Sequence, residues 1–161
     1  MAKTEVENRG IDNGVFETIC RIHDDQPCYH TMGIKLTYLG PGVAGMKKDP
    51  DLRFSTHGGR AQGGVLATLA DVVMGTAAFT NGYVHRTVEM SLNYLAPAFE
   101  DSMITAEGCV IHSGRTVVVV EASLFDKDGK LIAKSKGTFI RDSKTPNLQD
   151  VDDVGDSLAT S

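Results

Sequence analysis

The stretch GGVLATLADVVMGTAAFTNG, residues 63–82, decides the fold. Its length and its content of alanine, leucine, valine and methionine predict a helix, and the glycine at position 82 predicts where that helix ends. Apolar residues cover almost every side of this helix, and a helix of that kind must be buried. We therefore expect a sheet that curves around it.

The segments before and after this helix predict strands. Residues 34–39 alternate in polarity and are joined to residues 43–48 by Pro41-Gly42, which indicates a hairpin. A shorter helix is expected over residues 15–22 and should end near residues 24–27. Four β-rich runs follow the long helix: TVEMSLNYLAP, SMITAEGCVIHS, RTVVVVEASLFD and KLIAKSKGTFI. Short turns between them indicate antiparallel strands, so the fold class is α+β.

The length of 161 residues is sufficient for one domain with irregular ends. Both ends of the chain are polar and carry little apolar pattern. We therefore expect a single domain over residues 14–141, a flexible N-terminus at 1–13 and a flexible acidic C-terminal tail at 142–161.

Composition excludes several classes of partner and cofactor. The net charge of -5, without a dense run of lysine and arginine, argues against nucleic acid. The cysteines form no C-x-x-C pair and the chain start lacks the pattern of a secretion signal, so we expect a cytoplasmic protein. No apolar run is long enough to cross a bilayer, and no membrane association is expected. The histidines lack metal-ligand spacing, so we expect neither a metal nor another cofactor.

Asp71 is the first candidate for chemistry. It stands within VLATLADVVMG, where its neighbours are almost all apolar. A buried carboxylate is costly unless it is paired or hydrogen-bonded. It either accepts hydrogen bonds from structural groups, or it acts as a nucleophile or general base in a dry pocket where desolvation raises its basicity. The residues alone leave both interpretations open.

The start of the same helix, Gln62-Gly63-Gly64, is the second candidate. The first backbone N–H groups of a helix have no partner within it, and the helix dipole favours negative charge there. Such a site stabilises a developing oxyanion, and glycines let a carbonyl approach closely. A flexible loop with glycine at the helix start is the alternative interpretation.

These two candidates are too far apart to share one site within one chain. Gly63 and Asp71 are eight residues apart in the sequence. On one helix that spacing corresponds to about 12 Å. A common site therefore requires the Gly63 N–H of one subunit and the Asp71 of another whose helix runs antiparallel, so function predicts a two-fold dimer.

Three segments, GGVLATLAD, TVEMSLNYLAPA and SGRTVVVVEASLFDKDGKLIAKSKGTF, together resemble the hotdog-fold acyl-CoA thioesterases of the phenylacetate-degradation (PaaI-like) type. The resemblance covers residues 33–141. It implies a hotdog fold, in which an antiparallel sheet wraps a long central helix, and assembly as a homodimer or as a homotetramer built from two dimers. It also implies hydrolysis of acyl-CoA thioesters to the free acid and CoA.

The resemblance also implies roles for single residues. Asp71 would activate the attacking water or attack the thioester itself, and the Gly63 N–H would polarise the thioester carbonyl. Thr87 aligns with a hydroxyl that orients the water in relatives. The family has His-Gly-Gly at the helix start, and Gln62 stands here in place of that histidine. The triplet His57-Gly58-Gly59 lies five residues too far from Asp71 to be the same signature, and we expect it to be a loop.

Further positions follow from the resemblance with less support from the residues themselves. Relatives carry an amide side chain in the loop before the helix, where this chain has Thr56 and His57. His57 or Gln62 is the candidate substitute for a catalytic role, and a solvated loop histidine is the alternative for His57. Arg115 is a candidate contact for a CoA phosphate, or else it lies in an ordinary exposed turn. The other positions expected to bind substrate are Gln62, Gly64, Val88, Ser113 and Gly114.

Two other functions remain open at this point. The chain could be a non-catalytic acyl-CoA or acyl-ligand binding module, because Gln62 replaces the family histidine and the loop amide is missing. A hotdog dehydratase is a further alternative, which would need a histidine paired with a carboxylate, and His57 is the nearest candidate. The glycines at 58–64 lack the G-K-[ST] ending of a phosphate-binding loop, and no G-x-S-x-G elbow supports a serine hydrolase.

Overall fold

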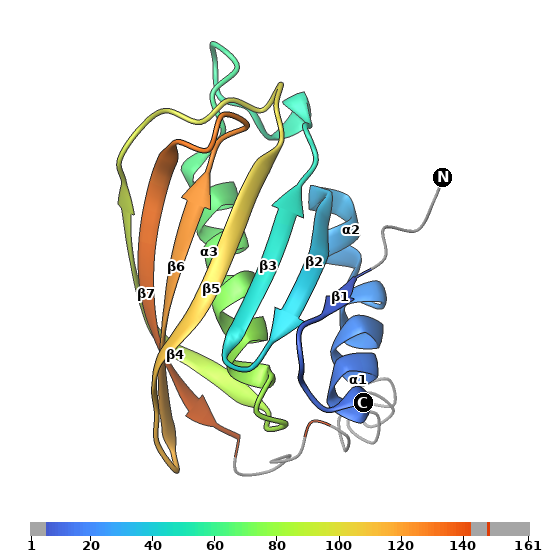
Figure 1. Ribbon diagram of the computed structural model, residues 1–161. Coiled ribbons are helices and arrows are strands. Elements are labelled where there is room, and N and C mark those ends of the chain that lie inside the picture. Colours follow the sequence, from blue (N-terminus) through green and yellow to red (C-terminus); the bar gives the residue numbers. More distant parts are fainter. Residues whose placement is uncertain (1–5, 143–147, 149–161) are drawn as a thin grey trace, which may run out of the picture.

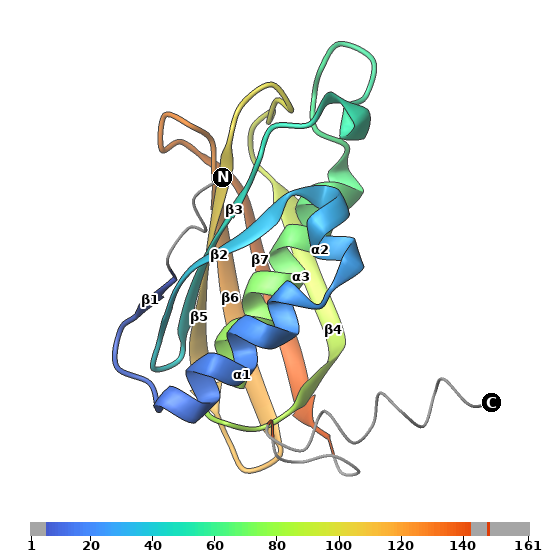
Figure 2. The ribbon, with the colours of Figure 1, turned by 90° about the vertical axis from the view of Figure 1, so that its right-hand side faces the viewer.

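The computed structural model of the chain describes residues 6–142 and Leu148. The strands form one sheet in the order β1-β2-β3-β5-β6-β7-β4, in which only the β1–β2 pair is parallel. Helix α3 lies along the inner face of this curved sheet, and α1 and α2 lie beside it near β2 (Figures 1 and 2). This arrangement confirms the predicted hotdog fold. The elements are β1 (Glu7–Asn8), α1 (Asn13–Asp24), α2 (Pro27–Met32), β2 (Ile34–Gly40), β3 (Val43–Lys48), the 3₁₀ helix η1 (Leu52–Phe54), α3 (Gly63–Phe79), β4 (His85–Tyr94), β5 (Ile104–Ser113), β6 (Val117–Phe125) and β7 (Leu131–Arg141).

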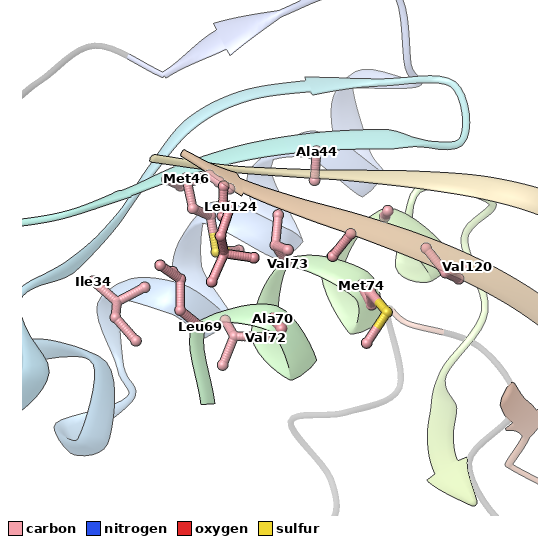
Figure 3. Packing of buried hydrophobic residues seen from close by; sticks show 14 of the residues in the cluster. Ile34, Ala44, Met46, Leu69, Ala70, Val72, Val73, Met74, Val120 and Leu124 are labelled. Carbon is pink, nitrogen blue, oxygen red and sulfur yellow. The ribbon is translucent and has the colours of Figure 1, made fainter. Parts of the chain in front are cut away.

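Helix α3 packs closely against the sheet along most of its length. Its residues Val73 and Met74 are fully buried, among strand residues that include Met46 of β3 and Leu124 of β6 (Figure 3). The sheet carries a glycine where the helix comes nearest: a Cβ atom on Gly108 of β5 would lie 2.6 Å from the Val73 carbonyl oxygen. The helix therefore lies as near to β5 as the two backbones allow. No helix of the described chain is long and apolar enough to span a membrane, α3 included.

One face of α3 is not covered by the sheet. The residues on it recur every three or four positions, as neighbours on one side of a helix do. They are small or polar, and each is at least partly exposed. The prediction of a helix that is apolar on nearly every side holds for the rest of α3. We call this uncovered side the open face of α3, and it consists of Gly64, Ala67, Thr68, Asp71 and Gly75.

The first residues of the chain differ from the flexible N-terminus expected at 1–13. Glu7–Asn8 pair in parallel with β2, and the Arg9 N–H donates to the Leu39 carbonyl oxygen at 2.7 Å. A two-residue edge strand has no periodicity of its own, so the sequence did not reveal it. Residues 1–5 lie outside the described residues.

The acidic tail expected at 142–161 falls only partly within the described residues. Asp142 is buried, and its carboxylate accepts a hydrogen bond from the Arg86 guanidinium at 2.5 Å. Leu148 is also buried, and its N–H donates to the Gly82 carbonyl oxygen at 3.1 Å. These two residues belong to the packed domain, so the boundary placed at residue 141 is too early.

Helix α1 is held against α3 by apolar side chains and by one buried polar pair. Ile19 is fully buried, and the His23 Nε2 atom lies 2.9 Å from the Thr76 hydroxyl oxygen. The His23 ring also contacts the Tyr29 ring, with 4.9 Å between their centroids. Burial of the imidazole lowers the pKa of His23 to about 4, and the nearby charge of Asp24 opposes this only in part. His23 is therefore neutral in the folded protein at pH 7.

The Gly108→Ala substitution tests the close approach of α3 to β5. It should lower the free energy of unfolding by about 1–3 kcal/mol, because the added methyl group overpacks against the α3 backbone. Gly75→Ala is the matched control: its Cβ would lie 3.6 Å from a Phe139 ring carbon, which is an ordinary contact. Alanine there should leave stability unchanged or raise it by up to about 1 kcal/mol. Urea unfolding measures both, and an unchanged stability of Gly108→Ala would contradict the packing described.

The pH dependence of stability tests the burial of neutral His23. As pH falls from 7 towards 4, the unfolded chain protonates His23 near pH 6.5 while the folded chain resists protonation down to about pH 4. The folded state should therefore lose on the order of 3 kcal/mol across this range. His23→Gln should remove this part of the dependence, whereas the exposed His112 changed to Gln should retain it. Identical pH profiles for wild type and His23→Gln would show that the imidazole is not buried in its neutral form.

Candidate active site

The start of α3 presents one unused backbone donor. The Gln62 side chain accepts a hydrogen bond from the Gly64 N–H, so Gln62 is the N-cap of the helix. The Tyr94 hydroxyl donates to the Gly63 carbonyl oxygen at 2.8 Å and thereby fixes this end of the helix to β4. Among the described residues, the Gly63 N–H has no hydrogen-bond acceptor. Gly63 therefore offers a free N–H at the positive end of the helix dipole.

A buried ion pair stabilises the loops in front of α3. The Lys48 ammonium contacts the Glu100 carboxylate, and the two side chains are 1% and 0% exposed. Lys48 also donates to the Asp49 carbonyl oxygen at 3.0 Å, and the Glu100 N–H donates to the Gly59 carbonyl oxygen at 3.1 Å. Removal of one member of such a pair typically costs about 3–5 kcal/mol. Neither residue stood out in the sequence, because lysine and glutamate ordinarily lie at the surface.

A groove of about 390 Å³ lies beside Gly63. Its walls come from the loop before α3, from the first turns of α3 and from the end of β4. Tyr94 and Leu95 contribute to it and are each 55% exposed, so apolar surface remains uncovered at this end of the molecule.

Asp71 lies in the middle of the open face of α3 and is half-buried. The Thr87 hydroxyl of β4 donates to its Oδ1 atom at 2.9 Å. Its Oδ2 atom has no hydrogen-bond partner within the described part of the chain. The expectation of a fully buried carboxylate is thus wrong for the single chain, because the neighbouring residues on the open face are small and uncovered. Thr87 therefore holds one carboxylate oxygen and leaves the other without a hydrogen bond.

Thr87 and Met90 lie on the same face of β4 because the strand contains a β-bulge between them. The pairing of β4 with β7 shifts register between Thr87 and Glu89, which leaves Val88 as an extra residue. Val88 is 54% exposed and Glu89 is also exposed, so two consecutive side chains face away from the core. Thr87 consequently lies on the same face as Met90, which packs against the core. Strict alternation counted back from Met90 would have turned Thr87 outward and Val88 inward, whereas the bulge keeps both His85 and Thr87 on the inner face.

A pocket of about 140 Å³ between α1, α3 and β4 contains both Asp71 and Thr87 in its wall. Burial raises the pKa of Tyr29, and the negative charge of Asp71 adds to the increase. The Tyr29 phenol and the Asp71 carboxylate therefore both line this pocket and are near enough to interact electrostatically. The other residues that line the pocket are Ile19, Ile22, His23, Tyr29, Val72, Gly75, Thr76, Phe79, His85 and Phe139.

The structure does not bring every predicted site residue to this pocket. His57 is exposed at the tip of the loop before α3, and the triplet at 57–59 is a loop as predicted. Arg115 is exposed in the turn between β5 and β6, together with Ser113 and Gly114. None of these residues lines the pocket or the groove. Val88 lies on the outer side of β4, away from Asp71.

The pocket also contains residues that the sequence did not assign to a site. His23 follows Ile19 and Ile22 at helical spacing, which could have placed it on the buried side of α1. No sequence signal places Tyr29 or His85 beside Asp71. Their proximity depends on how α2 and β4 fold over α3.

Comparison with known proteins agrees with this architecture. A family model described as the thioesterase superfamily matches residues 58–133, which include all of α3. A curated protein of Saccharolobus solfataricus, named as a candidate esterase, is 34% identical over 110 residues, which cover 67% of this chain and 78% of that protein.

Solved structures give the same result for the fold. The PaaI protein from the phenylacetic acid degradation operon of E. coli superposes with a TM-score of 0.80 at 20% identity, covering 84% of this chain and 99% of that one. A Streptococcus mutans protein bound to acetyl-CoA superposes with a TM-score of 0.65 at 23% identity, covering 68% of this chain and 88% of that one. The chain therefore belongs to the thioesterase superfamily and has the hotdog fold of the PaaI-like type.

Proposed function

We propose that the protein hydrolyses acyl-CoA thioesters to the free acid and CoA. The observation that carries this proposal is the Thr87–Asp71 hydrogen bond in the pocket wall, which orients a carboxylate and leaves one of its oxygens free. Membership of the thioesterase superfamily supports thioester hydrolysis in general. The acetyl-CoA bound to the Streptococcus mutans protein motivates the choice of CoA as the thiol.

Asp71 is the proposed base or nucleophile. As a base, its free oxygen takes a proton from water while the water oxygen bonds to the thioester carbonyl carbon. Thr87 donates its proton to the other carboxylate oxygen, so its lone pairs are available to hold that water. The carbon–sulfur bond then breaks, and the proton passes from Asp71 to the leaving thiolate. As a nucleophile, Asp71 would form an acyl anhydride that water then hydrolyses.

The free N–H of Gly63 is the proposed oxyanion donor. Loss of one such donor typically costs about a hundredfold or more in rate. Gly63 and Asp71 are separated by about 12 Å along α3, so the Gly63 that serves one Asp71 belongs to a second subunit.

Two surfaces support a two-fold dimer as the active unit. β4 lies at an edge of the sheet, and edges without a partner strand readily pair with another chain. The open face of α3 is built from small residues and lets a second backbone come close. Antiparallel helices that cross at Ala67, the midpoint between Gly63 and Asp71, would set each Asp71 opposite the other chain's Gly63. Two such dimers would make the proposed tetramer.

Substitution of Asp71 tests the base or nucleophile. Asp71→Asn should lower the rate of thiol release from acyl-CoA by about 10²–10⁴-fold, because the amide cannot take the proton. The dimer should persist, and Asp128→Asn, in the exposed turn between β6 and β7, is the matched control. An undiminished rate would sink the assignment. Tight binding of a non-hydrolysable acyl-CoA by wild type, without thiol release from the thioester, would favour the binding module instead.

A mixing experiment tests whether two chains build one site. Gly63→Pro removes the N–H, and proline is tolerated at the first position of a helix. The Asp71→Asn and Gly63→Pro variants should each be inactive alone. After unfolding and refolding together they should recover about a quarter of wild-type activity, because half of the dimers are mixed and each mixed dimer has one intact site.

Gly63→Ala, which keeps the N–H, is the control for steric damage beside Tyr94. No recovery in the mixture, despite the formation of mixed dimers, would contradict a site that is shared between two chains. A fully active monomer in sedimentation would have the same consequence.

A further inference from the structure

Two loops meet at the start of α3. Residues 49–62 lead into the helix, and residues 95–103 join β4 to β5. Both loops lie at the same end of the molecule (Figures 1 and 2). The Ala61 N–H donates to the Ala98 carbonyl oxygen at 2.9 Å. The two loops are therefore hydrogen-bonded to each other only two residues before Gly63.

The buried ion pair contacts the loop before α3 from two sides. Lys48 is the last residue of β3, and its ammonium nitrogen lies 5.6 Å from the centre of the Phe54 ring. The Phe54 carbonyl oxygen accepts a hydrogen bond from the Gln62 N–H at 3.1 Å. On the other side, the Glu100 N–H donates to the Gly59 carbonyl oxygen at 3.1 Å. The ion pair thus links β3 to both halves of the loop that leads into α3.

This ion pair is better suited to fixing geometry than to adding stability. The Oε1 atom of Glu100 is buried and has no hydrogen-bond partner among the described residues, which costs free energy. Replacement of a buried ion pair by apolar residues of similar volume is often neutral or stabilising. A charge-assisted hydrogen bond, unlike an apolar contact, constrains both the distance and the direction of its partners.

We propose that Lys48 and Glu100 are positioning residues, which hold the Gly63 N–H where the thioester oxygen becomes negative. The inference rests on the proposed function, since it takes Gly63 as the oxyanion donor. Such a donor acts when it lies about 3 Å from the developing charge, and a displacement of about 1 Å can cost about a hundredfold in rate. Neither side chain touches the substrate, because the two are 1% and 0% exposed. Both act through the loop.

The test replaces the pair by apolar residues in the double variant Lys48→Met/Glu100→Met. Methionine is unbranched and flexible, so it fills the space of either side chain. The urea midpoint of unfolding should stay the same or rise. For butanoyl-, octanoyl- or benzoyl-CoA, whichever wild type hydrolyses fastest, kcat should fall about tenfold or more. KM should change by less than about twofold, because an oxyanion donor acts in the transition state and not on the bound substrate.

Amide hydrogen exchange supplies a readout that does not depend on activity. The N–H groups of Ala61 and Gln62 are hydrogen-bonded across the loops, so in wild type they should exchange at least about tenfold more slowly than unprotected amides. In the double variant they should exchange about tenfold or more faster, while the central strand β6 keeps its wild-type rates. A general loss of stability would accelerate exchange in β6 as well.

The ion pair between Lys134 and Glu121 is the matched control. Its two charged atoms lie 3.1 Å apart on neighbouring strands, and the side chains are partly exposed. Lys134→Gln/Glu121→Gln should leave kcat and the exchange of both loop amides unchanged.

Faster exchange together with a lower kcat supports the proposal. A wild-type kcat in the folded double variant overturns it, as does a lower kcat with unchanged exchange or a rise in KM alone. If the double variant does not fold, wild-type exchange decides: protected Ala61 and Gln62 amides support the proposal, and unprotected ones overturn it.

Failure of this inference is distinguishable from failure of the proposed function. If wild type hydrolyses no thioester, the proposed function fails, and exchange in the double variant decides the rest. Faster exchange of the loop amides then retains the role of the ion pair in holding the start of α3. Unchanged exchange overturns both.

Discussion

The contact between the α3 backbone and Gly108 of β5 sets the distance between helix and sheet, and the rest of the fold depends on that distance. Buried apolar side chains fill the space between the helix and the sheet, as in a close-packed interior. The sheet curves to follow the helix, yet its two edges, β1 and β4, do not meet around it. Close burial of most of α3 and exposure of the face that carries Asp71 are therefore two results of the same packing.

The main elements could be predicted from the sequence because each has a local pattern. The composition of residues 63–82 is sufficient for α3, and turn residues separate the four strands that follow. The parallel strand at 7–8 and the bulge at Val88 could not be predicted, because each depends on the strand across the sheet. The same reason limits the site. The Gly63–Asp71 spacing can be read directly, since both residues lie on one helix, whereas alternation counted back from Met90 would turn Thr87 away from Asp71.

The described interior holds polar groups in three different ways. Lys48 and Glu100 neutralise each other and tie the loop before α3 to β3. His23 is neutral and is hydrogen-bonded to Thr76, so it joins two helices without a buried charge. Two buried polar atoms of the described residues, the Nδ1 of His85 and the Oε1 of Glu100, have no hydrogen-bond partner. The first two arrangements belong to the architecture of the fold.

The bulge at Val88 also bears on how relatives of this chain should be compared. Because of this one extra residue, odd-numbered side chains of β4 face the helix before the bulge and even-numbered ones face it after the bulge. A relative that lacks the extra residue but otherwise has the same β4 sequence would differ in whether a hydroxyl lies beside the helix carboxylate. Insertions and deletions in β4 are therefore as informative as substitutions. An alignment that ignores a one-residue gap in β4 would pair a residue that faces the helix with a residue that faces solvent.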